Sequence, residues 1–146
     1  MWMLRRLKQL GAREDDLLTV YRTQIRCVLE FSAPVWNPSL TNAQIGQIER
    51  VQKCALAIIL TDRYHSYDNA LTITSSETLM QRRELLCLKF AKKSAVHPKF
   101  SHWFCANRMK ERNTRQPIQT YKSVIARTKR YEKSPIAYLT RLLNEA

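Results

Sequence analysis

The stretch LEFSAPVWNPSLT, residues 29–41, sets two prolines around one tryptophan in a chain that otherwise has helical periodicity. Pro34 removes a backbone hydrogen bond and restrains the residue before it, so the preceding helix is expected to end or kink near this point. Pro38 is expected to keep the connector from becoming helical again. Thr41 and Gln44 then have the spacing of a capping box, which starts a new helix. The stretch therefore predicts a rigid corner between two helices.

Trp36 lies in this corner, between the two prolines. Burial of its indole against the two neighbouring helix faces would contribute a few kcal/mol and fix the angle between the helices. Stacking on a nucleic-acid base is the alternative role for an aromatic ring at such a position. We favour the packing role, which makes residues 1–60 mainly scaffold.

The sequence on either side of the corner predicts a helical hairpin over residues 1–60. Gly11 suits the position just past the end of a short helix over residues 3–10. Three acidic residues, 14–16, then match the positive end of the next helix, which is expected to run to about Ala33. Apolar residues recur at helical spacing in both long helices. They are Leu18, Tyr21, Ile25 and Val28 in the first, and Ile45, Ile48, Val51, Ala55 and Ile58 in the second.

A third helix is expected over residues 75–97, because Thr74 and Glu77 repeat the capping-box spacing and Pro98 ends the pattern. Its wide apolar arc contains Leu79, Met80, Cys87, Leu88, Phe90 and Ala91. Outside this arc, Arg82, Lys89 and Lys93 fall on one narrow line at 100° per residue. The helix can therefore pack and still present a row of cations.

Residues 106–133 lose this periodicity and form a basic segment with loop composition. Tyr121 and Tyr131 are interleaved with its cations, a mixture that suits contacts to phosphates together with base stacking. Ser134 and Pro135 then mark the start of a terminal helix over residues 135–144. The candidate nucleic-acid-binding residues of the segment are Arg108, Lys110, Arg112, Arg115, Lys122, Arg127, Lys129 and Arg130.

Taken together, these patterns predict an all-α fold, a small bundle of about four to five helices with a basic, partly irregular segment before the last one. At 146 residues a single domain over residues 1–146 is expected. The longest apolar run, residues 54–60, is far too short to span a bilayer. The N-terminus lacks the apolar stretch of a secretion signal. We expect an intracellular protein, with nucleus and cytoplasm both open.

The charge of the chain is unevenly distributed. Residues 1–73 carry nine basic and seven acidic side chains, whereas residues 74–146 carry sixteen and five. Such a field attracts polyanions, of which nucleic acid and an anionic membrane are the two candidates, although a merely solvated surface is the common alternative. The clustering in the second half argues against a merely solvated surface, and we expect nucleic acid, not a membrane, as the partner.

The four cysteines are widely spaced and form no CxxC pair, so reduced thiols, most of them buried, are expected. Zinc is the alternative that Cys87, His97, His102 and Cys105 leave open, although their spacing matches none of the common structural sites. We expect no cofactor and no catalytic residues, because the chain has neither a glycine-rich phosphate loop nor a pair of carboxylates in an apolar setting.

Several segments, in order along the chain, resemble the region downstream of the polymerase palm in non-LTR retrotransposon reverse transcriptases of the jockey and related LINE type. They are LRRLKQLGA, YRTQIRCVLEFSAPVWNPSLT, IERVQKCALAIIL, RRELLCLKFAKK, HPKFSHWF and KSPIAYLTRLLN. The resemblance is most specific in VLEFSAPVWNPSLT and IERVQK, and it covers nearly the whole chain. It implies the thumb and following segment of an RNA-directed DNA polymerase, without the acidic motif of the palm.

The resulting hypothesis is a non-catalytic domain that binds nucleic acid, such as an RNA–DNA hybrid, through a basic surface. A partner implied by the resemblance is the upstream palm of the parent polymerase. The rival hypothesis is a protein-interaction or structural fragment whose apolar N-terminal helix packs on that palm. The rival predicts an exposed patch around Trp2, Leu4 and Leu7.

Overall fold

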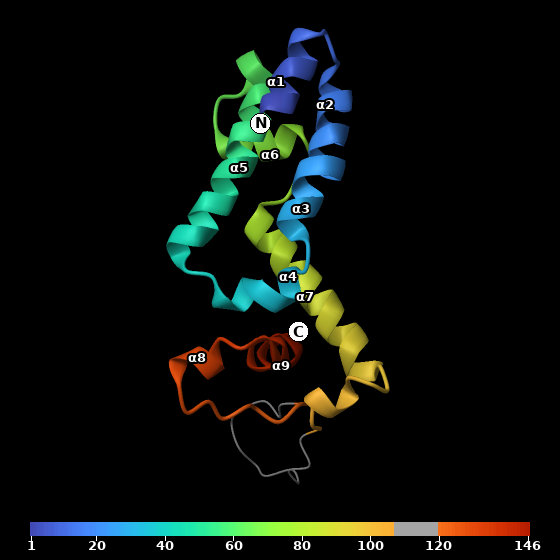
Figure 1. Ribbon diagram of the computed structural model, residues 1–146, viewed down its shortest axis with the longest axis vertical. Coiled ribbons are helices and arrows are strands. Elements are labelled where there is room, and N and C mark those ends of the chain that lie inside the picture. The colour runs from blue at the N-terminus through green and yellow to red at the C-terminus, as the bar shows by residue number, and fades with distance from the viewer. Residues whose placement is uncertain (107–119) are drawn as a thin grey trace. The chain divides into compact units, whose positions relative to one another are not determined.

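The computed structural model describes residues 1–106 and 120–146 of the chain (Figure 1). The fold is all-α, as the sequence predicts, and the described residues add only one isolated β-bridge to the helices. The chain divides into two compact units, unit 1 (residues 1–32 and 40–83) and unit 2 (residues 33–39 and 84–146). The single domain expected from chain length stays a prediction.

Unit 1 is built around three helices that contact one another, α1 (Trp2–Gln9), α2 (Glu14–Val20) and α5 (Asn42–Leu60). The expected turn after α1 is confirmed, since Gly11 has a φ of 85°. The three acidic residues of the sequence motif do lie in the first turn of α2. Figure 1 shows α5 running antiparallel to α2 within unit 1. The side chains buried at their junction are Leu4, Leu17, Tyr21, Ala55 and Ile59. The predicted hairpin over residues 1–60 stays a prediction, because residues 33–39 belong to unit 2.

The helix that begins with α2 does not keep one apolar stripe to its end. It continues as a π-helix over Tyr21–Arg26 and then as α3 (Cys27–Glu30). A π-turn contains more residues than an α-turn, so the residues after it rotate away from the face that precedes it. Val28, expected in the core, is accordingly 68% exposed. The helix also ends at Glu30 rather than near Ala33, followed by Ser32 at a φ of 53°.

The connector after α3 is helical, contrary to the expectation for Pro38. It forms α4 (Ala33–Trp36) and a 3₁₀ turn over Asn37–Ser39. Pro34 is tolerated because it occupies the first turn of α4, where no intrahelical bond needs its missing N–H. This segment belongs to unit 2, in which α4 contacts α9 (Pro135–Glu145). Trp36 is half-buried there, and its packing and stacking roles both stay predictions.

The two predicted helix starts have different outcomes. The capping box at Thr41 is confirmed, because the Thr41 N–H donates to Gln44 Oε1 at 2.9 Å and the Gln44 N–H donates back to Thr41 Oγ1 at 3.4 Å. The start assigned to Thr74 is wrong, since α7 (Leu79–Val96) begins four residues later. Its capping pair is Thr78 and Gln81. The Thr78 N–H donates to Gln81 Oε1 at 3.3 Å, and the Gln81 N–H donates to Thr78 Oγ1 at 3.2 Å. The Thr74 hydroxyl instead donates to the Ala70 carbonyl at the end of α6 (Tyr67–Ile73).

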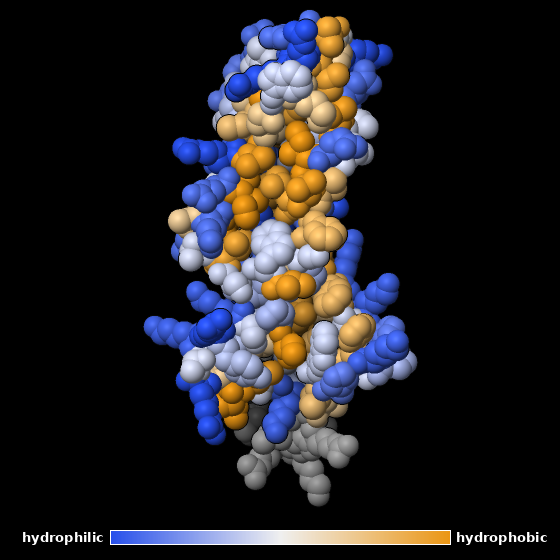
Figure 2. All heavy atoms as spheres, viewed as in Figure 1, coloured by the Kyte–Doolittle hydropathy of each residue, from blue (hydrophilic) through white to orange (hydrophobic). Residues whose placement is uncertain are grey.

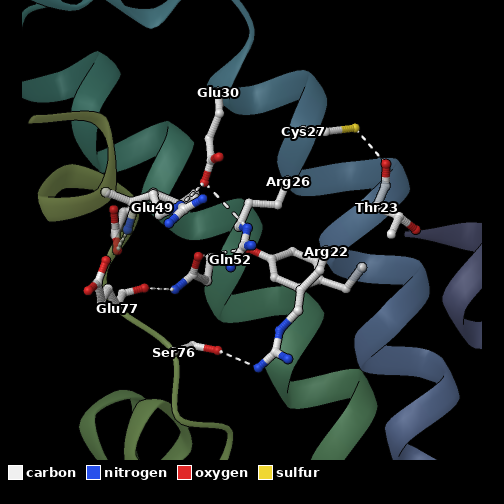
Figure 3. Close-up of polar contacts among 12 residues, drawn as sticks. Arg22, Thr23, Arg26, Cys27, Glu30, Glu49, Gln52, Ser76 and Glu77 are labelled. Atoms are coloured by element: carbon white, nitrogen blue, oxygen red, sulfur yellow. Dashed lines mark hydrogen bonds and ion pairs between the residues drawn. The ribbon is translucent and has the colours of Figure 1, made fainter. Parts of the chain in front are cut away.

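Buried polar contacts set the start of α7 within unit 1 (Figure 3). The Tyr21 hydroxyl donates to Gln52 Oε1 at 2.7 Å, and the Gln52 amide donates to the Glu77 carbonyl at 2.8 Å. Oε1 of Glu49 accepts from both the Tyr67 hydroxyl and the Leu79 N–H. Glu49 on α5 thus supplies the carboxylate that favours the first turn of α7.

The two tyrosines of this network predict a loss of stability in alkali. Burial raises the pKa of Tyr21 and of Tyr67, and the hydrogen bond to Glu49 raises the pKa of Tyr67 further. In the unfolded chain these phenols ionise near their usual pKa of about 10. Their contribution is therefore fully present below about pH 10 and is lost as the pH rises above it, because only the unfolded chain releases the protons. Urea unfolding at a series of alkaline pH values is expected to show this decline, and Tyr21→Phe is expected to make it shallower. An unchanged slope would contradict the assignment.

Unit 2 combines the second part of α7 with three later elements, a 3₁₀ turn over Ser101–Trp103, α8 (Lys129–Glu132) and α9. Pro135 begins α9 as expected, whereas the Ser134 side chain makes no capping bond. Two members of the apolar arc expected for α7, Met80 and Phe90, are partly exposed. The buried core of unit 2 consists of Cys87, Ala91, Phe104 and Leu139. No helix within residues 1–106 or 120–146 is both long and apolar enough to cross a membrane.

Candidate nucleic-acid interface

The described part of unit 2 presents its cations to solvent. All ten that lie in the described part of the chain are exposed, and within that part only Arg141 makes an ion pair, a 3.9 Å contact with Glu145 between two exposed side chains. An exposed pair of this kind contributes little to stability. The positive charge of these described residues is therefore available to an external partner. The ten residues are Lys89, Lys92, Lys93, Lys99, Lys122, Arg127, Lys129, Arg130, Lys133 and Arg141.

Arg82 differs from the other two members of the predicted cationic row. The helical backbone is continuous from residue 79 to 96, which keeps Arg82, Lys89 and Lys93 on one line. The Arg82 side chain, however, is partly buried in unit 1, where its Nε lies 3.0 Å from Glu30 Oε1. The same carboxylate also pairs with Arg26 at 3.3 Å. Arg82 is held in an ion-pair network, whereas Lys89 and Lys93 remain free to contact a ligand.

Other cations of unit 1 also have structural partners. The Lys8 amine donates to the carbonyls of Ile58 and Ile59, at 2.8 and 2.6 Å. It thus supplies donors to carbonyl groups at the C-terminal end of α5, which have no partner within the helix. The Arg22 guanidinium donates to the Thr74 carbonyl at 2.7 Å, and that of Arg63 contacts Glu14 at 2.8 Å. Several basic residues of unit 1 thus hold elements together, whereas no cation in the described part of unit 2 forms an ion pair with another element.

Net charge follows the same division. Unit 2 carries fourteen basic and four acidic side chains, against eleven and eight in unit 1. Figure 2 shows hydrophilic side chains reaching outward at both edges of unit 2 in this view, with apolar side chains between them. The cations are thus spread over several elements of unit 2, and the line on α7 is one part of that distribution.

The structure describes Ala106 and residues 120–133 of the predicted basic segment over residues 106–133. Lys122 and Arg127 are exposed in the chain segment before α8, and Lys129 and Arg130 are exposed within α8. The hydroxyl of Thr128 begins α8 by accepting from the Tyr131 N–H at 3.2 Å. The remaining predicted binding residues, Arg108, Lys110, Arg112 and Arg115, lie outside the described residues.

The two tyrosines assigned to stacking have different environments. Tyr121 packs against the core of unit 2, with its ring 6.1 Å from that of Phe104 in an edge-on arrangement. Asn144 also pairs with the Tyr121 backbone, accepting from its N–H at 3.0 Å and donating to its carbonyl at 3.1 Å. Tyr121 is therefore half-buried with its backbone held in place, and its role as a stacking ring stays a prediction. The Tyr131 ring, 50% exposed, remains available.

The zinc alternative gains no support from the geometry. Cys87 is buried, whereas Cys105 is exposed and its thiol faces the His102 carbonyl at 3.8 Å. His97 accepts a hydrogen bond from the Lys99 N–H through Nδ1. Over the described parts of the chain, no three His, Cys, Asp or Glu side chains lie close enough to hold a metal ion.

A row of aromatic side chains follows α7 and was not predicted as a nucleic-acid-binding surface. The ring centroids of His97 and Phe100 are 5.1 Å apart, and those of Phe100 and Trp103 are 4.9 Å apart. We call these three residues the ring ladder. The sequence contains a signal for it, an aromatic residue at every third position immediately after a helix end.

The exposed patch that the rival hypothesis predicts is only partly present. Leu4 is fully buried in the core of unit 1, and Leu7 packs against that core. Trp2 is 77% exposed, and Leu10 is exposed as well. The inner face of α1 is therefore already covered by the chain itself, and only its outer side could meet another protein.

Comparison of the chain with protein-family models, curated proteins and solved structures gives no match.

Proposed function

We propose that the chain binds nucleic acid without catalysing a reaction on it, in the way that its resemblance to the thumb and post-palm region of a non-LTR retrotransposon reverse transcriptase implies. The observation that carries the proposal is the state of the cations in unit 2. All ten that are described are exposed, and among described residues nine of them make no ion pair. Lysine and arginine side chains in this state can neutralise phosphates and release the counterions around them.

The ligand that fits both charge and resemblance is an RNA–DNA hybrid, the product of RNA-directed DNA synthesis. Phosphate contacts from unit 2 would position the duplex without reading its sequence. In this proposal unit 1 is the scaffold, and the upstream palm of a parent polymerase is its expected protein partner. We also propose an intracellular location, where such a ligand occurs.

Binding is expected to weaken steeply with salt. If about four phosphates are contacted, affinity for the hybrid falls roughly a hundredfold between about 50 and 200 mM salt. Fluorescence anisotropy of a labelled hybrid, titrated at the two salt concentrations, measures this change. Absence of binding at the lower concentration would refute the proposal.

The rival function predicts a different result in the same samples. A fragment that only docks on another protein through Trp2 and Leu10 is expected to self-associate and to ignore the hybrid. Sedimentation of the free chain tests self-association independently of nucleic acid. A monomer that binds the hybrid excludes the rival as the main role of the chain.

A further inference from the structure

We propose that the ring ladder, His97, Phe100 and Trp103, is a stacking site for unpaired bases, so that the chain prefers nucleic acid with a single-stranded extension. This inference rests on the proposed function and assigns one of its contacts. It concerns single-stranded nucleic acid because bases within a duplex are already stacked, whereas an unpaired base has a free face for an aromatic ring.

The ladder is built by the backbone that follows α7. Pro98 prevents α7 from continuing, and the chain turns with hydrogen bonds from Phe100 N–H to the His97 carbonyl and from Trp103 N–H to the Phe100 carbonyl, both of 2.9 Å. Side chains three residues apart eclipse in this 3₁₀-like geometry, which brings the three rings into one row. The spacing of the aromatic residues thus determines their alignment.

One end of the ladder is fixed and the other is open. Trp103 packs against the core of unit 2, and the next residue, Phe104, is buried within that core. Phe100 is half-buried, and His97 is exposed. A row of rings that is already ordered loses little conformational freedom on binding. It can therefore stack a base at small entropic cost.

Cations lie next to the ladder. Lys93 precedes His97 by one turn of α7, and Lys99 lies between His97 and Phe100 in the turn. Both are exposed, and within the described residues neither forms an ion pair with an acidic side chain. Single-strand-binding sites combine aromatic rings, which stack on bases, with basic side chains, which contact the phosphate backbone.

The test compares a blunt RNA–DNA hybrid with the same hybrid carrying an unpaired extension of about six nucleotides. The unaltered chain is expected to bind the extended ligand about tenfold more tightly than the blunt one. Phe100→Leu keeps an apolar side chain but removes the ring, and it is expected to bring the two affinities within about twofold. Phe100→Tyr is expected to restore the preference. Circular dichroism and thermal unfolding verify that each variant folds.

Phe90→Leu is the matched control, because it makes the same substitution at a partly exposed ring of unit 2 that lies outside the ladder. Its preference for the extended ligand is expected to match that of the unaltered chain. Equal affinity of the unaltered chain for both ligands, an undiminished preference in Phe100→Leu, or equal weakening of both ligands by that variant would overturn the ladder assignment alone. Failure to bind the blunt hybrid at low salt would instead overturn the proposed function.

Discussion

Replacing Glu49 with alanine is expected to lower the free energy of unfolding by about 3 kcal/mol. A single oxygen, Oε1, accepts from the Tyr67 hydroxyl and from the N–H of Leu79, a fully buried residue at the start of α7. Alanine would leave both donors without this acceptor, and the cost of an unpaired buried donor is about 1–3 kcal/mol. Urea unfolding followed by circular dichroism measures the loss.

Glu49→Gln is the informative companion to this substitution. Its amide keeps one acceptor oxygen for Tyr67 and Leu79, while it removes the charge and replaces Oε2, a buried atom with no hydrogen bond among the described residues. The glutamine variant is therefore expected to lose clearly less stability than the alanine variant. An alanine variant within about 0.5 kcal/mol of the unaltered chain would show that α7 does not depend on this contact.

Reversing the charge of Lys89 and Lys93 together is expected to weaken binding of the RNA–DNA hybrid by roughly tenfold to a hundredfold at low salt. Both side chains are exposed on α7 in unit 2, and neither forms an ion pair among the described residues, so their substitution by glutamate disturbs no described partner. The variant loses two phosphate contacts and adds two repulsive charges at the same place. Anisotropy titration gives the change in affinity, and the salt dependence should also become shallower.

The matched control reverses the charge of Arg5 and Arg13, two exposed cations of unit 1 that form no ion pair among the described residues. This variant has the same net charge as Lys89→Glu/Lys93→Glu, but the change lies outside unit 2. It is expected to bind nearly as well as the unaltered chain. Equal weakening by the two variants would mean that overall charge, rather than the surface of unit 2, governs binding.

Local signals in the sequence predict helix starts well only where no tertiary contact competes. Thr41 and Gln44 lie together at one helix start, and the structure confirms them. Two threonines four residues apart, Thr74 and Thr78, both have the capping spacing, so the sequence cannot choose between them. The choice depends on Glu49, far away in the chain, which satisfies the N–H of Leu79 rather than that of an earlier residue.

Partners distant in sequence also decide which side chains are free. Arg82 has the periodicity of a solvent-facing cation, yet its partner Glu30 precedes it by 52 residues. The cations around Tyr121 in the sequence suggest a ring available for stacking. Its backbone, however, is hydrogen-bonded to Asn144, 23 residues away. The prediction that Val28 faces the core is wrong for another reason, because nothing in the sequence reveals the π-helix over Tyr21–Arg26 before it. Charge counts and periodicity thus predicted that the second half of the chain is basic. Which of its side chains are accessible depends on contacts that only the fold reveals.

The contact between α4 and α9 has a consequence for how the chain is made. The Asn37 amide lies 3.5 Å from the Tyr138 hydroxyl, although 101 positions separate the two residues. During synthesis the α4 segment must therefore leave the ribosome long before its partner exists, and unit 2 can close only after the C-terminal helix has emerged. Closure over so many residues is slow compared with local helix formation, which makes assembly of unit 2 a late step on the folding pathway.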